Sequence, residues 1–137
     1  MINKIELTKK ERDTIIAVGD YGEKDFPLRL VDLSGMLGVR PPTALNLVKR
    51  LEEKGCLSDE KGMIIFTDQG KRVYDELVEN HRVMETLMAK SGMDPEKACL
   101  MSGNIDYLID HISVDRLFSG MGKPKNCPHG KKIEQIH

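Results

Sequence analysis

The sequence predicts a mainly α-helical protein, in which a domain of short helices and one β-hairpin precedes a domain of longer amphipathic helices. Three observations support this fold class. Apolar residues recur at helical spacing in several segments, a short apolar run follows a turn near residue 60, and capping residues, glycines and prolines separate the segments. With 137 residues, the chain has the length of one domain or of a small domain with an appendage.

The composition is that of an ordinary soluble chain with an aliphatic core. Hydrophobic residues make up 39%, charged residues 31% and aromatic residues only 4%, so the eight methionines are expected to fill gaps in the core. The net charge is −1, and any contact with nucleic acid must therefore come from a local basic patch. No apolar run approaches the roughly 20 residues that span a bilayer, and the N-terminus lacks the apolar region of a signal peptide. We therefore expect a cytoplasmic protein without a membrane partner.

Residues 7–18 are predicted to form the first helix. Thr8 can cap this helix, and Glu11 follows three residues later, which is the capping-box spacing. Gly19 and Gly22 are expected to end it, because the segment that follows is rich in turn-forming residues.

Two further helices are predicted on either side of a tight turn at Gly38. The first covers residues 29–37, and Gly38 ends it in the manner of a helix C-terminus. The second opens with Pro41 and Pro42, at positions where the backbone N–H has no intrahelical partner, and Gly55 closes it. Aliphatic side chains supply the apolar faces of the two helices: Leu30, Leu33, Leu37, Leu45, Val48 and Leu51.

The period of the apolar residues changes over residues 56–67. The turn sequence Ser-Asp-Glu-Lys-Gly is followed by Met-Ile-Ile-Phe-Thr, which predicts a short hairpin. Thr67 is then expected to cap a long helix over about residues 69–90.

Asp94 and Pro95 are expected to begin a further helix, whose apolar stripe continues to Ile112. His111 on this helix is expected to face solvent. Residues 121–137 are rich in glycine, proline and lysine, and we predict a flexible tail that contains the sequence CPHG.

The order helix, helix, turn, helix, hairpin is that of a winged helix-turn-helix DNA-binding domain, which we predict over residues 1–70. The two prolines give a rigid shape to the first turn of the recognition helix, the part that enters the major groove. Arginine and asparagine can pair with base edges, whereas Lys49, Arg50 and Lys61 are expected to contact phosphates. The candidate DNA-binding residues are Arg40, Pro42, Thr43, Asn46, Lys49, Arg50 and Lys61. Such side chains also occur on solvated helix faces that bind nothing, and this alternative stays open.

Residues 71–120 are predicted to form an α-helical dimerisation domain, because amphipathic helices leave apolar surface that a winged helix does not cover. A homodimer places two recognition helices on half-sites one turn of duplex apart. The alternative is a helical hairpin that covers its apolar surface within one chain.

The chain resembles the metal-dependent repressors of the diphtheria-toxin-repressor and manganese-transport-regulator family. The resemblance is carried in order by GVRPPTALNLVKRLEEKGCL, FTDQGKRV, ENHRVMETL, SGMDPEKACLMSGNIDYLIDHISVDRL and NCPHGKKI, and the chain is similar to the two-domain form. It implies a transcriptional regulator, a dimeric repressor whose affinity for a double-stranded DNA operator is controlled by a divalent transition metal such as iron(II) or manganese(II). The sequence shows no nucleophile–base pair and no phosphate-binding loop, so we do not expect an enzyme.

The resemblance also implies a set of metal ligands. His81 matches a histidine of the long helix, and Glu85 stands four residues later on the same face. Cys99 lies near the position of a second-site histidine, while Asp106 and Asp13 match family carboxylates. A thiolate ligand favours iron(II), cobalt, nickel or zinc over manganese.

Other positions depart from the family pattern. Gly103, Tyr107 and Lys10 stand where the family has ligands, so the principal metal site is incomplete. An alternative is therefore a winged-helix regulator with a degraded metal site that senses redox state or another ligand through Cys99 or Cys127. Cys127 and His129 could add two ligands, but a simple turn over CPHG is the favoured interpretation.

Overall fold

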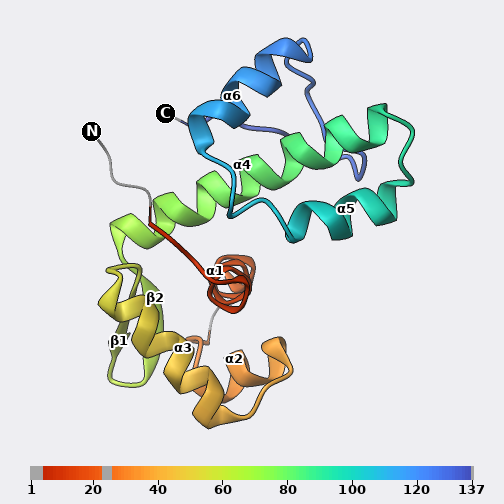
Figure 1. The fold of residues 1–137 in the computed structure, drawn as a ribbon. Helices are drawn as coiled ribbons and strands as arrows, with labels where there is room; N and C mark the ends of the chain where they lie inside the picture. The colour runs from red at the N-terminus through yellow and green to blue at the C-terminus, as the bar shows by residue number, and fades with distance from the viewer. Residues whose placement is uncertain (1–4, 23–25, 137) are drawn as a thin grey trace. The chain divides into compact units, whose positions relative to one another are not determined.

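The structure is a computed structural model that describes residues 5–22 and 26–136. Its internal contacts divide the chain into two compact units, residues 7–74 and residues 75–137, with the N-terminal residues assigned to the second. Eight elements are described: α1 (Lys9–Tyr21), α2 (Leu30–Leu37), α3 (Pro41–Glu53), β1 (Leu57–Glu60), β2 (Met63–Phe66), α4 (Asp68–Lys90), α5 (Pro95–Gly103) and α6 (His111–Gly120) (Figure 1). The predicted mainly helical class is confirmed, whereas the predicted domain boundaries at residues 70 and 120 stay predictions.

The first helix, α1, begins with the predicted capping box. The Thr8 hydroxyl accepts from the Glu11 N–H at 3.2 Å, and the Thr8 N–H donates to the Glu11 carboxylate at 2.9 Å. Of the two glycines predicted to end this helix, Gly22 closes it after Tyr21, whereas Gly19 lies inside the helix. Gly19 is needed inside the helix because a Cβ there would lie 2.0 Å from the ring of Tyr74.

Helices α2 and α3 form the predicted pair around Gly38, which adopts a φ of +66°. Pro41 and Pro42 occupy the first two positions of α3, and the buried side chains of this helix are Ala44, Leu47, Val48 and Leu51. Leu45 is half-buried, so the core stripe includes Leu47 in its place.

The antiparallel hairpin pairs Leu57 with Phe66 and Glu60 with Met63. Lys61 and Gly62 form its two-residue turn with φ values of 53° and 85°, the left-handed pair that a type I′ turn requires. The Arg29 guanidinium donates to the Lys61 carbonyl at 3.0 Å and thereby ties the tip of the hairpin to the start of α2.

Helix α4 starts where the Thr67 hydroxyl accepts from the Gly70 N–H at 3.0 Å, as predicted. The apolar stripe that predicted a single helix as far as Ile112 is divided between α5 and α6. The reason is Asp110, whose carboxylate accepts from the N–H groups of Ile112 and Ser113 and caps a new helix. None of the described helices combines the length and hydropathy needed to cross a bilayer.

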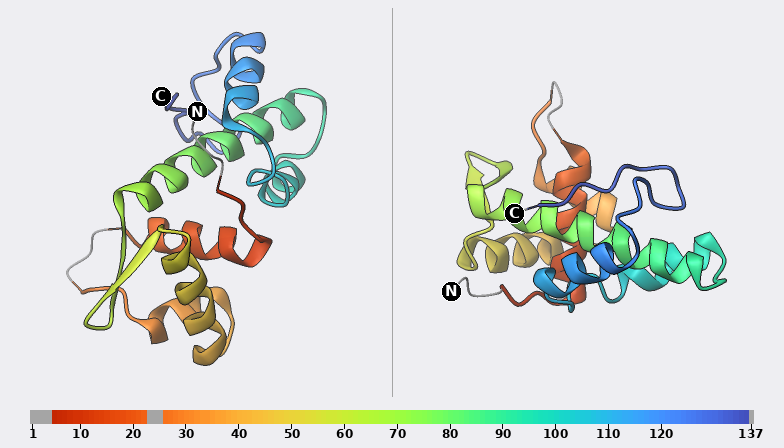
Figure 2. Two further views of the ribbon diagram at one scale, coloured as in Figure 1. Left: turned by 60° about the vertical axis from the view of Figure 1, so that its left-hand side comes forward. Right: turned by 90° about the horizontal axis from the view of Figure 1, so that it is seen from above.

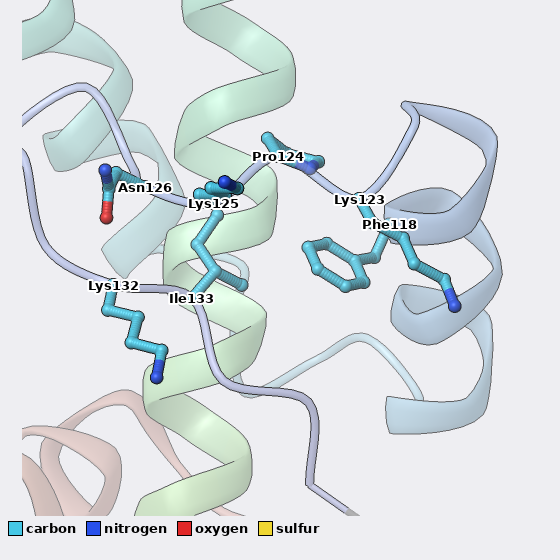
Figure 3. Close-up of a pocket in the computed structure, with 7 residues that line it drawn as sticks. All are labelled: Phe118, Lys123, Pro124, Lys125, Asn126, Lys132 and Ile133. Atoms are coloured by element: carbon cyan, nitrogen blue, oxygen red, sulfur yellow. The ribbon is translucent and has the colours of Figure 1, made fainter.

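Residues 121–136 pack within the second unit, against α4 and α6, rather than forming the loosely ordered tail that we predicted. The Ile133 side chain joins Val83, Val114 and Phe118 in an apolar cluster, and the Arg82 guanidinium on α4 donates to the Lys132 carbonyl at 2.6 Å. The segment runs beside α4 (Figure 2), and Phe118 and Ile133 both line a cavity of about 420 Å³ (Figure 3). Burial of these apolar side chains holds the segment in place despite its polar composition.

Candidate metal centre

Three of the predicted ligands meet in the second unit. Helix α4 carries His81 and Glu85 one turn apart, and α5 supplies Cys99. One potential ligand atom from each of the three side chains lies within 4.8 Å of the others, and the Cys99 Sγ is 3.5 Å from the His81 Nε2. Glu85 is only 2% exposed, so its carboxylate is held among these groups away from bulk water.

Asp106 lies on the other side of the His81 ring. Its fully buried carboxylate is 3.0 Å from the His81 Nδ1, which donates to it when the ring is neutral. The lone pair of His81 Nε2 then points toward Cys99, the arrangement in which a carboxylate fixes the tautomer of a metal-binding histidine. The sequence predicts Asp106 as a ligand, whereas the structure places it against the opposite ring nitrogen.

Two more donors reach Glu85 from the CPHG segment. The His129 Nδ1 lies 2.9 Å from a Glu85 oxygen, and Glu85, Cys127 and His129 form a second group with ligand atoms within 4.8 Å of one another. The segment does make the expected turn, with the Gly130 N–H donating to the Cys127 carbonyl at 2.9 Å and Gly130 at a φ of 78°. This same turn holds the thiol and the imidazole beside Glu85, a role that the turn interpretation missed. The Cys-Pro-His spacing is the sequence feature that could have indicated this role of Cys127 and His129.

The electrostatics of the cluster favour a cation. Burial raises the pKa of the Cys99 thiol, and the neighbouring Glu85, Glu96 and Cys127 raise it further. These neighbours are all acids, so a thiolate at Cys99 is repelled from every one of them. A bound divalent ion reverses that repulsion and stabilises the deprotonated thiol.

Asp13 belongs to the other unit, where its carboxylate pairs with Lys9 at 2.8 Å and with Arg12 at 3.0 Å. Its role as a ligand stays a prediction.

The predicted DNA-binding residues lie in the first unit, at the start of α3, along its outer face and at the hairpin tip. Six of them are exposed: Arg40, Pro42, Asn46, Lys49, Arg50 and Lys61. Thr43 is half-buried. Arg40 is the residue before the first turn of α3, directly ahead of the two prolines.

Comparison with known proteins gives a family for the second half of the chain and relatives for most of its length. Residues 67–135 match the family model described as iron dependent repressor, metal binding and dimerisation domain. An uncharacterized HTH-type transcriptional regulator of Aeropyrum pernix is 26% identical over 106 residues, which are 77% of this chain and 59% of that protein. The HTH-type transcriptional regulator MntR of Bacillus subtilis is 28% identical over 112 residues, which are 76% of this chain and 79% of that protein.

Solved structures share the fold. The hypothetical protein SSo2273 from Sulfolobus solfataricus superposes with a TM-score of 0.81 at 30% identity, covering 93% of this chain and 99% of that one. A manganese-dependent transcriptional repressor in complex with manganese gives a TM-score of 0.75 at 22% identity, covering 90% of this chain and 57% of that one. The chain therefore belongs to the iron-dependent repressor family of metal-binding transcriptional regulators.

Proposed function

We propose that the chain is a dimeric transcriptional repressor whose affinity for its DNA operator is controlled by a divalent transition metal bound around Glu85. The observation that carries this proposal is the convergence of four further donors on one buried carboxylate, from three separate segments: His81, Cys99, Cys127 and His129. As a DNA-binding regulator rather than an enzyme, the protein acts in the cytoplasm.

The donor set fits a transition metal. It offers two thiols, two imidazoles and one carboxylate, and the soft thiolates favour iron(II), cobalt(II), nickel(II) or zinc(II) over manganese(II). When bound, the ion supplies positive charge that offsets the repulsion between Glu85 and the thiolates. Asp106 supports the site through its hydrogen bond to His81. The redox alternative is not favoured, because both cysteines lie among imidazole and carboxylate donors that a thiol sensor does not need.

Metal binding would organise the surface that forms the dimer. Cys99 is next to Leu100, which is 69% exposed, and two more apolar side chains of the second unit, Leu108 and Ile112, are exposed by 60% and 66%. A ligated Cys99 fixes α5 on α4 and so fixes part of this apolar surface, which a second copy of the chain would cover. We expect Ile112→Glu to convert the dimer to a monomer in sedimentation experiments, and an unchanged dimer would contradict this assignment.

The first unit supplies the DNA contacts. Arg40, Thr43 and Asn46 lie near the N-terminus of α3, where a recognition helix meets base edges. Lys49 and Arg50 further along α3, with Lys61 at the hairpin tip, offer positive charge to the phosphates. A metal that stabilises the dimer increases the population of the state in which two such helices bind together.

Cobalt(II) titration tests the metal site directly, because thiolate ligation gives a charge-transfer absorption that oxygen or nitrogen ligation does not. We expect this absorption in the wild-type protein, its loss in the Cys99→Ser/Cys127→Ser double variant and its retention in Cys56→Ser. Cys56 is the matched control, since it is a buried thiol of the first unit. Absence of the thiolate absorption from the wild-type protein would refute the proposal.

A further inference from the structure

A second cluster of potential ligands lies in the same unit, around the N-terminal end of α6. Glu79 comes from α4, and His111 and Asp115 come from successive turns of α6. The His111 Nε2 is 3.7 Å from the Glu79 Oε1, 3.7 Å from the Asp115 Oδ2 and 2.9 Å from the Ile136 carbonyl oxygen. One potential ligand atom from each of the three side chains lies within 4.8 Å of the others. His111 is thus enclosed, in contrast to our expectation that it faces solvent.

The tautomer of His111 is set by Asn80. The Asn80 amide nitrogen donates to the carbonyls of Asp106 and Ile109 at 3.1 and 3.3 Å, which directs its amide oxygen toward the His111 Nδ1 at 3.1 Å. In a neutral ring the proton therefore sits on Nδ1, and Nε2 presents a lone pair. A metal-binding histidine is commonly oriented by a hydrogen bond from its other ring nitrogen, and Asn80 accepts this hydrogen bond from His111.

The cluster then contains more acceptors than donors. The His111 Nε2 lies 2.9 Å from the Ile136 carbonyl oxygen, so it donates a proton to this oxygen when no ion is bound and offers its lone pair only when an ion replaces that proton. Glu79 is 2% exposed, and its Oε2 and the Asp115 Oδ1 are buried without a hydrogen-bond partner among the described residues. The Ile136 N–H donates to the Glu79 Oε1, which leaves these other atoms unsatisfied. Buried acceptors that face one another are stabilised by a proton or a cation between them, and a divalent cation would replace the proton on the His111 Nε2.

We propose that Glu79, His111, Asp115 and the Ile136 carbonyl bind a divalent cation at a site separate from the one around Glu85. Adjacent ligands of an octahedral ion held at about 2.1 Å lie about 3.0 Å apart, so separations of 2.9–3.7 Å suit ligands of one ion. Residues two apart on a helix do not face each other, and Glu79 is therefore directed away from the side of α4 that carries His81. A bound ion would fasten the segment at Ile136 to α4 and α6.

The two sites differ in chemical hardness. The site around Glu79 offers three oxygens and one imidazole nitrogen and no sulfur, which suits manganese(II), whereas the site around Glu85 includes two thiols. The inference therefore goes beyond the proposed function and can stand or fall without it.

Manganese(II) binding to the full chain, followed by electron paramagnetic resonance of the free ion, tests the inference. Asp115→Asn removes one ligand charge with no change in size, and Glu134→Gln removes an exposed carboxylate nearby as the matched control. We expect the wild-type protein, Glu134→Gln and the Cys99→Ser/Cys127→Ser variant to bind manganese equally at this site. Asp115→Asn should bind it at least about tenfold more weakly. His111→Gln should show the same loss, and the thiolate absorption with cobalt(II) should persist in both variants.

Equal manganese binding by Asp115→Asn and the wild-type protein, or no manganese binding by the cysteine variant, would overturn the inference. Circular dichroism in the presence of a chelator keeps the test independent of folding, since matching spectra show that a weaker affinity comes from the site. If the wild-type protein shows no cobalt–thiolate absorption but its manganese binding still depends on Asp115, only the proposed function is refuted and the inference stands.

Discussion

Replacing Asp106 by asparagine tests whether Asp106 binds the metal itself or acts on the metal by orienting His81. The Asp106 carboxylate is fully buried and lies 3.0 Å from the His81 Nδ1, on the ring nitrogen that faces away from Cys99. Asparagine keeps the size of the side chain and removes its charge. The imidazole of His81 then loses the acceptor charge that makes it a stronger donor to the metal.

Loss of such an outer contact typically weakens metal binding by about 10- to 100-fold. Each factor of ten corresponds to about 1.4 kcal/mol, so the expected cost is about 1.4–2.8 kcal/mol of metal-binding free energy. Cobalt(II) titrations of wild-type and Asp106→Asn protein give both affinities, and the spectra at saturation report the ligands. We expect weaker binding with an unchanged saturated spectrum. A changed spectrum would make Asp106 a ligand, and an unchanged affinity would refute the role of Asp106 in orienting His81.

Three further predictions concern DNA binding, pH and stability. Lys49→Ala should weaken binding to all DNA sequences and reduce its salt dependence, whereas Asn46→Ala should mainly relax base preference; similar behaviour of the two variants in salt titrations would contradict the division of roles on α3. Because its surroundings raise the pKa of Cys99, cobalt(II) binding must release the thiol proton, and calorimetry should show affinity rising from about pH 6 to pH 8; a flat profile would exclude thiol ligation. Lys54→Met should destabilise the first unit by about 1–3 kcal/mol, because Glu11 is buried and the Lys54 Nζ lies 2.7 Å from its carboxylate. Burial raises the pKa of Glu11, but Lys54 and Thr8 lower it by more, so the stabilisation is present above the ordinary carboxyl pKa and is lost as the pH falls through the lowered value. Equal urea midpoints of Lys54→Met and the wild-type protein at pH 7 would show that this pair contributes nothing.

The elements that the sequence predicts correctly are those set by local chemistry. Thr8 and Glu11 form a capping box because both partners lie within one turn, and Pro41 and Pro42 start α3 for the same kind of local reason. The sequence does not predict the division of α5 from α6, because the apolar period continues past the break and the new helix is set only by the Asp110 cap.

The candidate metal site shows which functional residues the sequence alone can bring together and which it cannot. His81 and Glu85 share a helical face, so their spacing alone brings them together. Cys127 and His129 reach Glu85 only through tertiary packing, since they are more than 40 residues away along the chain. The local sequence does not indicate that these residues lie close to Glu85 in space. It also does not indicate that Ile136 packs against His111.

The central claim, that metal bound around Glu85 controls DNA binding, is tested most directly by one affinity measurement. The DNA is a fragment selected from a random pool by the cobalt-loaded protein, and its binding is followed by fluorescence anisotropy with and without cobalt(II). We predict an affinity about 5- to 150-fold higher with cobalt(II) for the wild-type protein, and no gain for Glu85→Gln. Equal affinity of the wild-type protein with and without the metal would contradict the claim.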